Sequence, residues 1–361
     1  MEYKNKLIQF KQNRVWRSYI GGKVLDEIAG VLSPKDSHFP EEWIASTTKA
    51  VNPGRDHIRE GESIAILSGQ SINFSELIAL DPEYFLSSDH VEKFGMNPMV
   101  LVKFLDSSIR LHFQAHPTRE FAQKYLSSAS GKAEAYYILK VREGIENPYI
   151  YLGFQHPPQR EELKNIIIDQ DIPSLKKCFE KIPVEEGQCY FIPGGMPHAI
   201  GEGILMIEIM EPSDWAVRFE FERGGYCLPE EARFMKHDLD FCLDVFDYSQ
   251  QHTHEVIAKN KKKPKPIKTY FDGSSKSMLI DGSTTDRYRV CRSNIIQRIV
   301  KQEQDFYIAI VTQGECTITL GDERVTLRQF DKFFCPAGVD SIEIETVNGV
   351  EIIECYPPLP V

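Results

Sequence analysis

The 361-residue chain lacks the long apolar segments of membrane-spanning and secreted proteins. No apolar run reaches the roughly 18 to 20 residues that a transmembrane helix needs. Residues 1–6 contain no apolar stretch of the signal-peptide kind. We therefore expect a cytoplasmic protein with no membrane partner.

Closely spaced cysteine pairs are also absent. Eight cysteines are scattered from Cys178 to Cys355, and no two of them form a Cys-x-x-Cys pair. A chain of this length does not depend on a disulfide scaffold for its stability. We expect most of these cysteines to be buried thiols, which pack as small apolar side chains.

The chain has no surplus of cations. It contains 42 Lys and Arg against 53 Asp and Glu, which gives a formal net charge of −11 at pH 7. Proteins that bind nucleic acid in general hold its phosphates with a surplus of Lys and Arg. We therefore expect no nucleic-acid partner, and a phosphate group on a small ligand must be bound by a few local cations.

Four residues of metal-binding type stand at suggestive spacings. Alternate side chains of a strand share a face, so Gln114 and His116 are expected to point the same way, as are Lys132 and Glu134. His198 follows a Pro-Gly-Gly turn that lets the chain double back. An amide, two imidazoles and a carboxylate suit zinc, with manganese, iron and cobalt as alternatives.

The chain is predicted to divide into two mainly β parts, residues 1–258 and 268–361. Short apolar segments and turns recur in both parts. Between them, residues 259–267 form a basic run with prolines, which predicts a linker because like charges and proline resist packing. A helical insertion is expected near residues 159–182, where apolar residues recur every three or four positions and Pro173 is expected to break the helix.

The second part repeats one turn of the first without its histidine. The run Pro336-Ala337-Gly338 echoes the turn before His198, but Ser341 stands at the position of that histidine. No histidine occurs after His254. The second part is therefore predicted to be a metal-free structural copy.

The run that begins at Gly187 and ends at His198, G-x5-P-x-G-x2-H, resembles the second motif of the cupin superfamily. Segments 101–106, 111–117, 131–134 and 193–200, in this order, resemble type I mannose-6-phosphate isomerases, in which a glutamine ligand is characteristic. The resemblance implies two cupin-type jelly-roll barrels with a few helices packed on the first. It also implies a metal-dependent aldose–ketose isomerase that interconverts mannose 6-phosphate and fructose 6-phosphate.

The resemblance further assigns roles to individual residues. It implies one Zn2+ per chain, a sugar phosphate as small-molecule partner, and a monomer or homodimer. The metal ligands are then Gln114, His116, Glu134 and His198. The implied catalytic residues are Lys132, Glu208 and Arg218, with either Glu208 or Lys132 as the base, and the implied substrate or phosphate ligands are Lys103, His112, Lys132 and Arg218.

Two departures from the family pattern keep other functions open. His112 stands where the family commonly has serine, and Trp215-Ala216-Val217 stands where smaller polar residues and a tyrosine are usual. The alternatives are an isomerase of a different sugar or sugar phosphate, a non-catalytic sugar-binding cupin, and an iron-dependent cupin oxygenase. Gln114 argues against the oxygenase, which prefers an open, histidine-rich ligand set.

Overall fold

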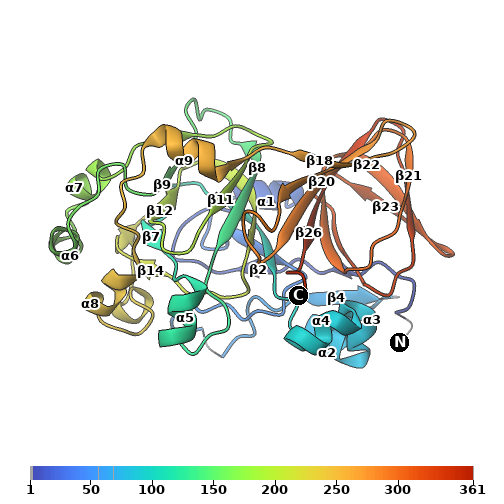
Figure 1. The fold of residues 1–361 in the computed structure, drawn as a ribbon, viewed down its shortest axis with the longest axis horizontal. Helices are drawn as coiled ribbons and strands as arrows, with labels where there is room; N and C mark the ends of the chain where they lie inside the picture. Colours follow the sequence, from blue (N-terminus) through green and yellow to red (C-terminus); the bar gives the residue numbers. More distant parts are fainter. Residues whose placement is uncertain (1–2, 56, 68, 361) are drawn as a thin grey trace.

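The computed structural model describes residues 3–55, 57–67 and 69–360, and most of its regular structure is β-strand. Two barrels lie side by side along the long axis of the molecule (Figure 1). The first is built by the earlier part of the chain and the second by the later part. The expectation of a mainly β protein is confirmed.

The first barrel is made of two sheets that enclose an apolar cluster to which both contribute. The seven-stranded sheet has the order β17-β11-β8-β13-β6-β3-β2, and the five-stranded sheet has the order β10-β9-β12-β7-β14. The strands of the larger sheet are β2 (Arg14–Val15), β3 (Glu41–Ile44), β6 (Leu101–Asp106), β8 (Glu134–Val141), β11 (Cys189–Ile192), β13 (Ile204–Met210) and β17 (Lys261–Lys262). Those of the smaller sheet are β7 (Gln114–Ala115), β9 (Tyr149–Leu152), β10 (Ile182–Pro183), β12 (His198–Ile200) and β14 (Val217–Arg218).

The second barrel is one nine-stranded sheet that curls around its own apolar cluster. The longest strand, β22, pairs with β24 and β26 along its first part. Further on it pairs with β23 and β25, and this pairing closes the curl. The strands are β18 (Lys265–Thr269), β19 (Ser275–Ile280), β20 (Arg289–Ile295), β21 (Arg298–Lys301), β22 (Tyr307–Leu320), β23 (Glu323–Arg328), β24 (Lys332–Cys335), β25 (Ile342–Glu345) and β26 (Val350–Tyr356).

The predicted helical insertion forms two helices, α6 (Arg160–Asp169) and α7 (Ile172–Lys177). Their apolar residues pack in one cluster with side chains of the five-stranded sheet, as expected. The break between them lies at Gln170, which has a left-handed backbone with φ of 50°. Pro173 instead lies in the first turn of α7, where a missing N–H costs nothing.

Helices also cover the second barrel, which the sequence did not predict. They are α2 (Phe74–Leu80), α3 (Pro82–Leu86) and α4 (Ser88–Phe94), and they come from the first part of the chain. The Phe74 ring meets the Phe334 ring edge-on with centroids 5.0 Å apart. The carbonyl of Phe85 accepts a hydrogen bond from the amide of Ala337. The expectation of helices on the first barrel alone was therefore too narrow.

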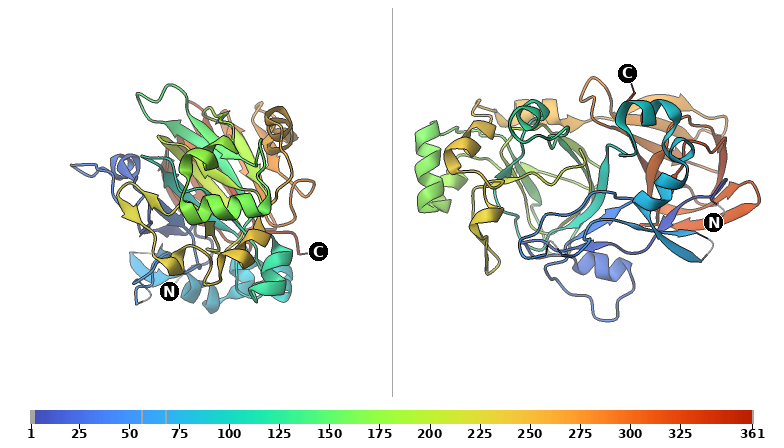
Figure 2. Two further views of the ribbon diagram at one scale, coloured as in Figure 1. Left: turned by 90° about the vertical axis from the view of Figure 1, so that its left-hand side faces the viewer. Right: turned by 90° about the horizontal axis from the view of Figure 1, so that it is seen from below.

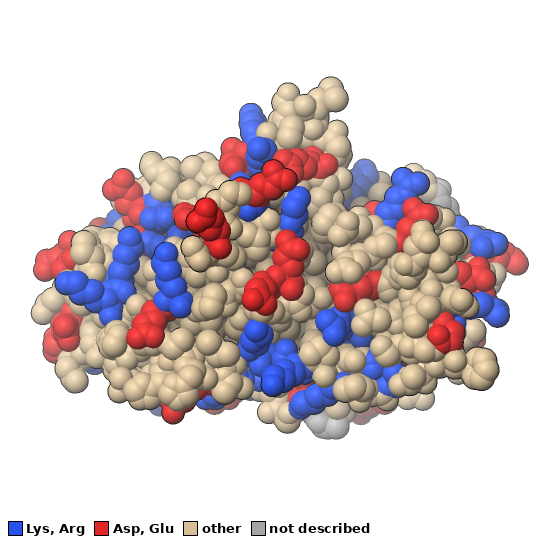
Figure 3. All heavy atoms as spheres, turned by 90° about the horizontal axis from the view of Figure 1, so that it is seen from above, with Lys and Arg blue, Asp and Glu red and all other residues tan. Residues whose placement is uncertain are grey.

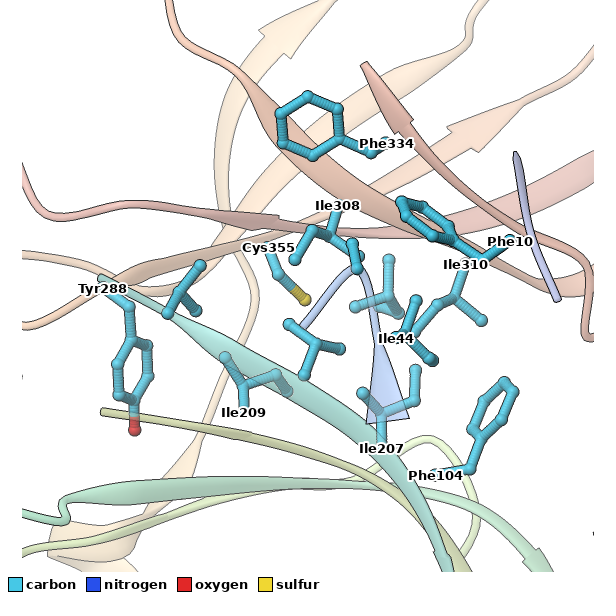
Figure 4. Close-up of a cluster of buried hydrophobic side chains, with 14 of the residues drawn as sticks. Phe10, Ile44, Phe104, Ile207, Ile209, Tyr288, Ile308, Ile310, Phe334 and Cys355 are labelled. Carbon is cyan, nitrogen blue, oxygen red and sulfur yellow. The ribbon is translucent and has the colours of Figure 1, made fainter. Parts of the chain in front are cut away.

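One apolar cluster joins the two barrels (Figure 4). Ile207 and Ile209 of β13 lie in it together with Ile308 and Ile310 of β22, and Phe10 of the N-terminal segment packs there too. Burial of this shared surface makes separation of the barrels unfavourable. The boundary seen in the sequence therefore does not imply that the two parts fold independently.

The basic run 259–267 connects the barrels but packs more than a free linker does. Its start belongs to α9 (Thr253–Asn260), Lys261 pairs with Tyr190 at the edge of the seven-stranded sheet, and Lys265 opens β18. The run therefore pairs through its backbone at two sheet edges, which its charge and prolines did not lead us to expect. The lysines of β18 are exposed while their backbone pairs, which is how charged edge strands behave.

The remaining elements are short. They are β1 (Gln9–Phe10), β4 (Ile64–Leu67), β5 (Gln70–Asn73), β15 (Glu222–Arg223), β16 (Tyr226–Cys227), α1 (Lys23–Ile28), α5 (Arg119–Tyr125), α8 (Leu239–Cys242) and the 3-10 turns η1 (Glu230–Ala232) and η2 (Leu243–Val245). Of the helices in the described part of the chain, none is long and apolar enough to cross a bilayer. The helices α6 and α8 lie at the end of the first barrel that faces away from the second barrel. The helix α5 lies at the lower edge of the first barrel (Figures 1 and 2). Cations and anions are interspersed on the face shown in Figure 3.

Candidate metal centre and active site

A row of three side chains crosses the five-stranded sheet inside the first barrel. Gln114 on β7 is in register with His198 on β12 and with Arg218 on β14. Residues that stand directly opposite in an antiparallel pair project from the same face. The row therefore brings two predicted metal ligands and one predicted cation to the same side of the sheet.

A second row crosses the seven-stranded sheet. Lys103 on β6 is in register with Glu208 on β13, which is in register with Tyr136 on β8. Glu134 lies two residues before Tyr136 and shares its face. All four side chains are buried, which is rare for charged groups unless they are paired.

The two sheets bring His116, Glu134 and His198 together. Each of the three offers one ligand atom, and these atoms all lie within 4.8 Å of one another. Nε2 of His116 lies 3.2 Å from Oε1 of Glu134, and Nε2 of His198 lies 3.6 Å from Oε2 of Glu134. Two imidazoles and one carboxylate suit zinc and leave a position for a further ligand.

Hydrogen bonds fix both imidazoles in the orientation that a metal needs. Nδ1 of His116 donates to the carbonyl of Trp215 at 2.7 Å, and Nδ1 of His198 donates to the carbonyl of Met196 at 2.8 Å. The Nε2 lone pairs are therefore directed at Glu134. Burial and the nearby Lys132 charge lower the pKa of His116 to about 3, so the ring is neutral, the form that binds metal.

Lys132 and Gln114 complete the surroundings of the three ligands. Nζ of Lys132 lies 2.9 Å from Oε1 of Glu134 and 3.1 Å from Nε2 of His116, so the ligand atoms already attract a cation. The amide of Gln114 lies 3.4 Å from Nε2 of His198. A buried donor set of this kind matches a divalent cation.

A cavity beside the three ligands gathers the other predicted site residues. It is lined by Lys103, His112, Gln114, Lys132, Glu208 and Arg218. Every residue that the sequence suggested for catalysis or substrate binding therefore lies in one pocket. Carboxylate, ammonium and guanidinium groups next to a metal centre can move a proton and hold an anion.

Glu208 has the environment of a proton-transfer group. Burial raises the pKa of Glu208 to about 8, opposed by the Lys103 charge and supported by the charge of Glu134. Nζ of Lys103 lies 2.9 Å from Oε2 of Glu208. A carboxyl group with a pKa near neutrality can both take and return a proton at physiological pH.

Sequence reasoning missed a network of charges that supports Lys103. Glu41 lies 3.4 Å from Nζ of Lys103 and accepts hydrogen bonds from Arg17 at 2.9 Å and from Tyr19 at 2.5 Å. Arg17 also pairs with Asp214 at 3.0 Å. The signal in the sequence was weak, because Arg17 and Tyr19 share only a two-residue spacing and stand far from every motif.

Arg218 has no ion-pair partner within residues 3–55, 57–67 and 69–360. Its guanidinium donates to the carbonyl of Ala232 at 2.9 Å, and it forms no ion pair with any residue that the structure describes. The other cations of the pocket, Arg17, Lys103 and Lys132, all have such pairs. A half-buried guanidinium with no carboxylate of a described residue at ion-pair distance favours an anionic ligand.

His112 presents a hydrogen-bond acceptor to the pocket. Its Nδ1 donates to the carbonyl of Glu220 at 2.9 Å, and its Nε2 has no hydrogen-bond partner among the described residues. Burial and the Arg218 charge lower the pKa of His112 to about 4, so the ring is neutral. Its free nitrogen therefore accepts a hydrogen bond, for example from a sugar hydroxyl.

The curated proteins that are similar to this chain all carry the name mannose-6-phosphate isomerase. No family model matches the chain. A curated mannose-6-phosphate isomerase from Streptococcus mutans serotype c is 26% identical over 276 residues, which are 75% of this chain and 79% of that protein. The similarity confirms the predicted resemblance, and it does not favour the alternative functions.

Solved structures show the same fold. The crystal structure of the mannose 6-phosphate isomerase from Bacillus subtilis has a TM-score of 0.73 at 19% identity, covering 97% of this chain and 99% of that one. A zinc-bound mannose 6-phosphate isomerase has a TM-score of 0.70 at 14% identity, covering 98% and 100%. The likeness extends over both barrels, as the predicted two-barrel fold requires.

Proposed function

We propose that this protein is a metal-dependent aldose–ketose isomerase of the mannose-6-phosphate isomerase type, which interconverts mannose 6-phosphate and fructose 6-phosphate. The observation that carries the proposal is the meeting of His116, Glu134 and His198 beside a pocket that holds Glu208 and Arg218. The names of the curated relatives support the same substrate. A cytoplasmic location and a monomeric or dimeric state remain predictions.

The proposed metal ligands are His116, Glu134 and His198, with Gln114 as the fourth. The set suits Zn2+, with Mn2+, Fe2+ or Co2+ as substitutes. When bound, such an ion supplies a Lewis acid for the oxygens on C1 and C2 of the sugar. Tyr136 donates to Oε2 of Glu134 at 2.5 Å and so holds this carboxylate in place.

Glu208 is the proposed base. The isomerisation moves one proton between C2 and C1 of the sugar, so a single group can remove it and return it to the neighbouring carbon. Glu208 is buried, its carboxylate is held by Lys103, and its pKa lies close to neutrality. Lys132 shares the pocket, and we assign it to stabilisation of the negative charge that develops on the sugar oxygens.

Arg218 is the proposed anion ligand. Its guanidinium has no ion pair with a described residue and faces the same cavity as Glu208. The planar fork of an arginine matches the oxygens of a phosphate or an enediolate. We place His112 nearby as an acceptor for a sugar hydroxyl, a role that differs from direct phosphate binding and that agrees with its neutral ring.

A substrate panel tests the proposal. Zinc-loaded protein is incubated with mannose 6-phosphate, glucose 6-phosphate, ribose 5-phosphate and free mannose, and ketose formation is followed by NMR. We expect kcat/KM for mannose 6-phosphate to exceed that of every other substrate by about 100-fold or more. No turnover of any of them by protein with a full metal content would refute the proposal, and faster turnover of another sugar would refute the substrate.

A further inference from the structure

A second cavity, of about 290 Å³, lies at the junction of the two barrels and shares no lining residue with the pocket beside the metal ligands. It is bordered by the end of α4, the start of α5 and the last residues of the chain. The chain end lies between these helices in Figure 1. Phe94, Met99 and Leu359 make part of its wall apolar, and Arg119 and Arg287 stand at its border.

Apart from the buried Glu211, which lies 3.7 Å from Arg287, the carboxylates near the two arginines are exposed. Arg287 lies 3.2 Å from its neighbour Asp286 and 3.5 Å from Glu120, but these carboxylates are 71% and 77% exposed. Arg119 reaches Asp286 only at 3.9 Å. By contrast, Arg289 at the same cavity is bound at 2.7 Å to Asp305. Water-exposed partners at these distances hold a guanidinium weakly.

We propose that the junction cavity binds a small organic phosphate, with its phosphate group on Arg119 and Arg287 and its carbon part against Phe94, Met99 and Leu359. Guanidinium groups bind phosphate through parallel charge-assisted hydrogen bonds, which the exposed carboxylates do not provide at present. The volume of about 290 Å³ is at the low end for a ligand site, which suits a small ligand.

The cavity is connected to the first barrel through Glu211. Nε of Arg287 lies 3.7 Å from Oε1 of Glu211. The same carboxylate accepts hydrogen bonds from the amides of Gly131 at 3.2 Å and Ala133 at 3.0 Å, which flank Lys132. A ligand that draws Arg287 away leaves the two amides as the hydrogen-bond partners of this carboxylate among the described residues. Binding at the junction therefore strengthens the hydrogen bonds of the Gly131 and Ala133 amides on either side of Lys132.

Calorimetry on matched variants tests the site. Glycerol 3-phosphate is the probe, and the R218Q background removes the proposed anion ligand of the pocket beside the metal centre. We expect R218Q to bind the probe, R218Q/R287Q to bind it at least tenfold more weakly, and R218Q/R298Q to match R218Q. Arg298 is the control because its side chain is 61% exposed and it pairs with Glu343 on the second barrel.

Equal affinity of R218Q and R218Q/R287Q would overturn the proposal, as would the absence of probe binding in R218Q with an unchanged thermal midpoint. A third variant, R218Q/R287K, keeps the positive charge at position 287 but lacks the paired N–H donors of a guanidinium. We expect it to bind the probe with intermediate affinity. Amide hydrogen exchange tests the connection. The probe should slow exchange at Gly131 and Ala133 at least threefold in R218Q and not in R218Q/R287Q, and unchanged exchange in saturated R218Q would contradict the role of Glu211.

Discussion

Lys103 and Glu208 stand opposite each other on neighbouring strands, with Nζ of the lysine 2.9 Å from Oε2 of the glutamate. Both side chains are almost fully buried, so each needs the other for electrostatic compensation. The pair places a carboxyl group of raised pKa beside the proposed metal ligands and keeps it in one orientation. Such an arrangement suits a group that exchanges a proton with a bound substrate.

Replacement of Glu208 by glutamine should stop proton transfer without loss of the metal. We expect kcat for mannose 6-phosphate to fall at least ~100-fold, the usual contribution of a general base. Zinc content, measured by elemental analysis, should stay at the wild-type value because Glu208 is not a proposed ligand. Glu202→Gln, at an exposed turn position, is the control. Near-normal turnover in a zinc-replete Glu208→Gln variant would exclude Glu208 as the base.

Arg218 offers a test of where the substrate phosphate binds. We expect Arg218→Gln to lower kcat/KM for mannose 6-phosphate about 100-fold and that for free mannose much less, because a lost guanidinium–phosphate pair affects only the phosphorylated substrate. Arg218→Lys should have an intermediate kcat/KM for mannose 6-phosphate, since it keeps the positive charge but lacks the paired N–H donors of the guanidinium. Equal losses on both substrates would instead place Arg218 at the reacting carbons.

His198 and Glu134 should be required for metal binding. We expect His198→Ala and Glu134→Gln to lose most of the bound zinc, and with it at least ~100-fold in activity. His156→Ala is the matched control, because this histidine side chain is 63% exposed and lies outside the site. Elemental analysis after dialysis gives the zinc content. Retention of stoichiometric zinc by both His198→Ala and Glu134→Gln would place the metal elsewhere.

Glu354, inside the second barrel, should make the free energy of unfolding depend on pH. Although burial opposes it, the charges of Lys301 and Lys276 lower the pKa of Glu354 to about 2 from an ordinary 4.5. The carboxylate binds its proton more weakly in the folded state, so its stabilisation is complete above about pH 4.5 and is lost as the pH falls toward 2. The expected loss is about 3 kcal/mol.

Thermal unfolding between pH 3 and pH 6 measures the part of this loss that occurs above pH 3, about 2 kcal/mol. Glu354→Gln should be less stable at neutral pH by roughly 3 kcal/mol, because Lys276 and Lys301 lose their buried shared anion and keep only the partly exposed Glu303. Its thermal midpoint should also fall less between pH 6 and pH 3 than that of the wild type. Glu343→Gln, in a surface pair with Arg298, should follow the wild type. Parallel pH profiles of Glu354→Gln and wild type would contradict the role of Glu354.

Much of the site could be predicted because its residues lie close to short motifs. The two-residue spacing of Gln114 and His116 and the turn before His198 are local, and strand geometry alone places such side chains on one face. The buried pair of Arg110 with Glu220 at 2.7 Å was not predicted, because the regular strand at this point is only Gln114–Ala115.

Features that depend on contacts between distant segments could not be predicted. Arg17 and Asp214 are 197 positions apart and meet only because β2 and the segment before β14 both border the pocket. The packing of α2–α4 on the second barrel has the same origin, since their apolar faces give no information about their partner. The strands within residues 259–267 were missed because proline and like charges were given more weight than backbone pairing at a sheet edge.

The proposed isomerisation of mannose 6-phosphate in the first barrel requires a bound metal. The most direct measurement is the rate of fructose 6-phosphate formation by protein that has been stripped with a chelator, dialysed, and then given increasing amounts of Zn2+. We expect a rate near zero in stripped protein and recovery that levels off at one Zn2+ per chain. A rate that is unchanged by removal of the metal, or no rate at any zinc content, would contradict it.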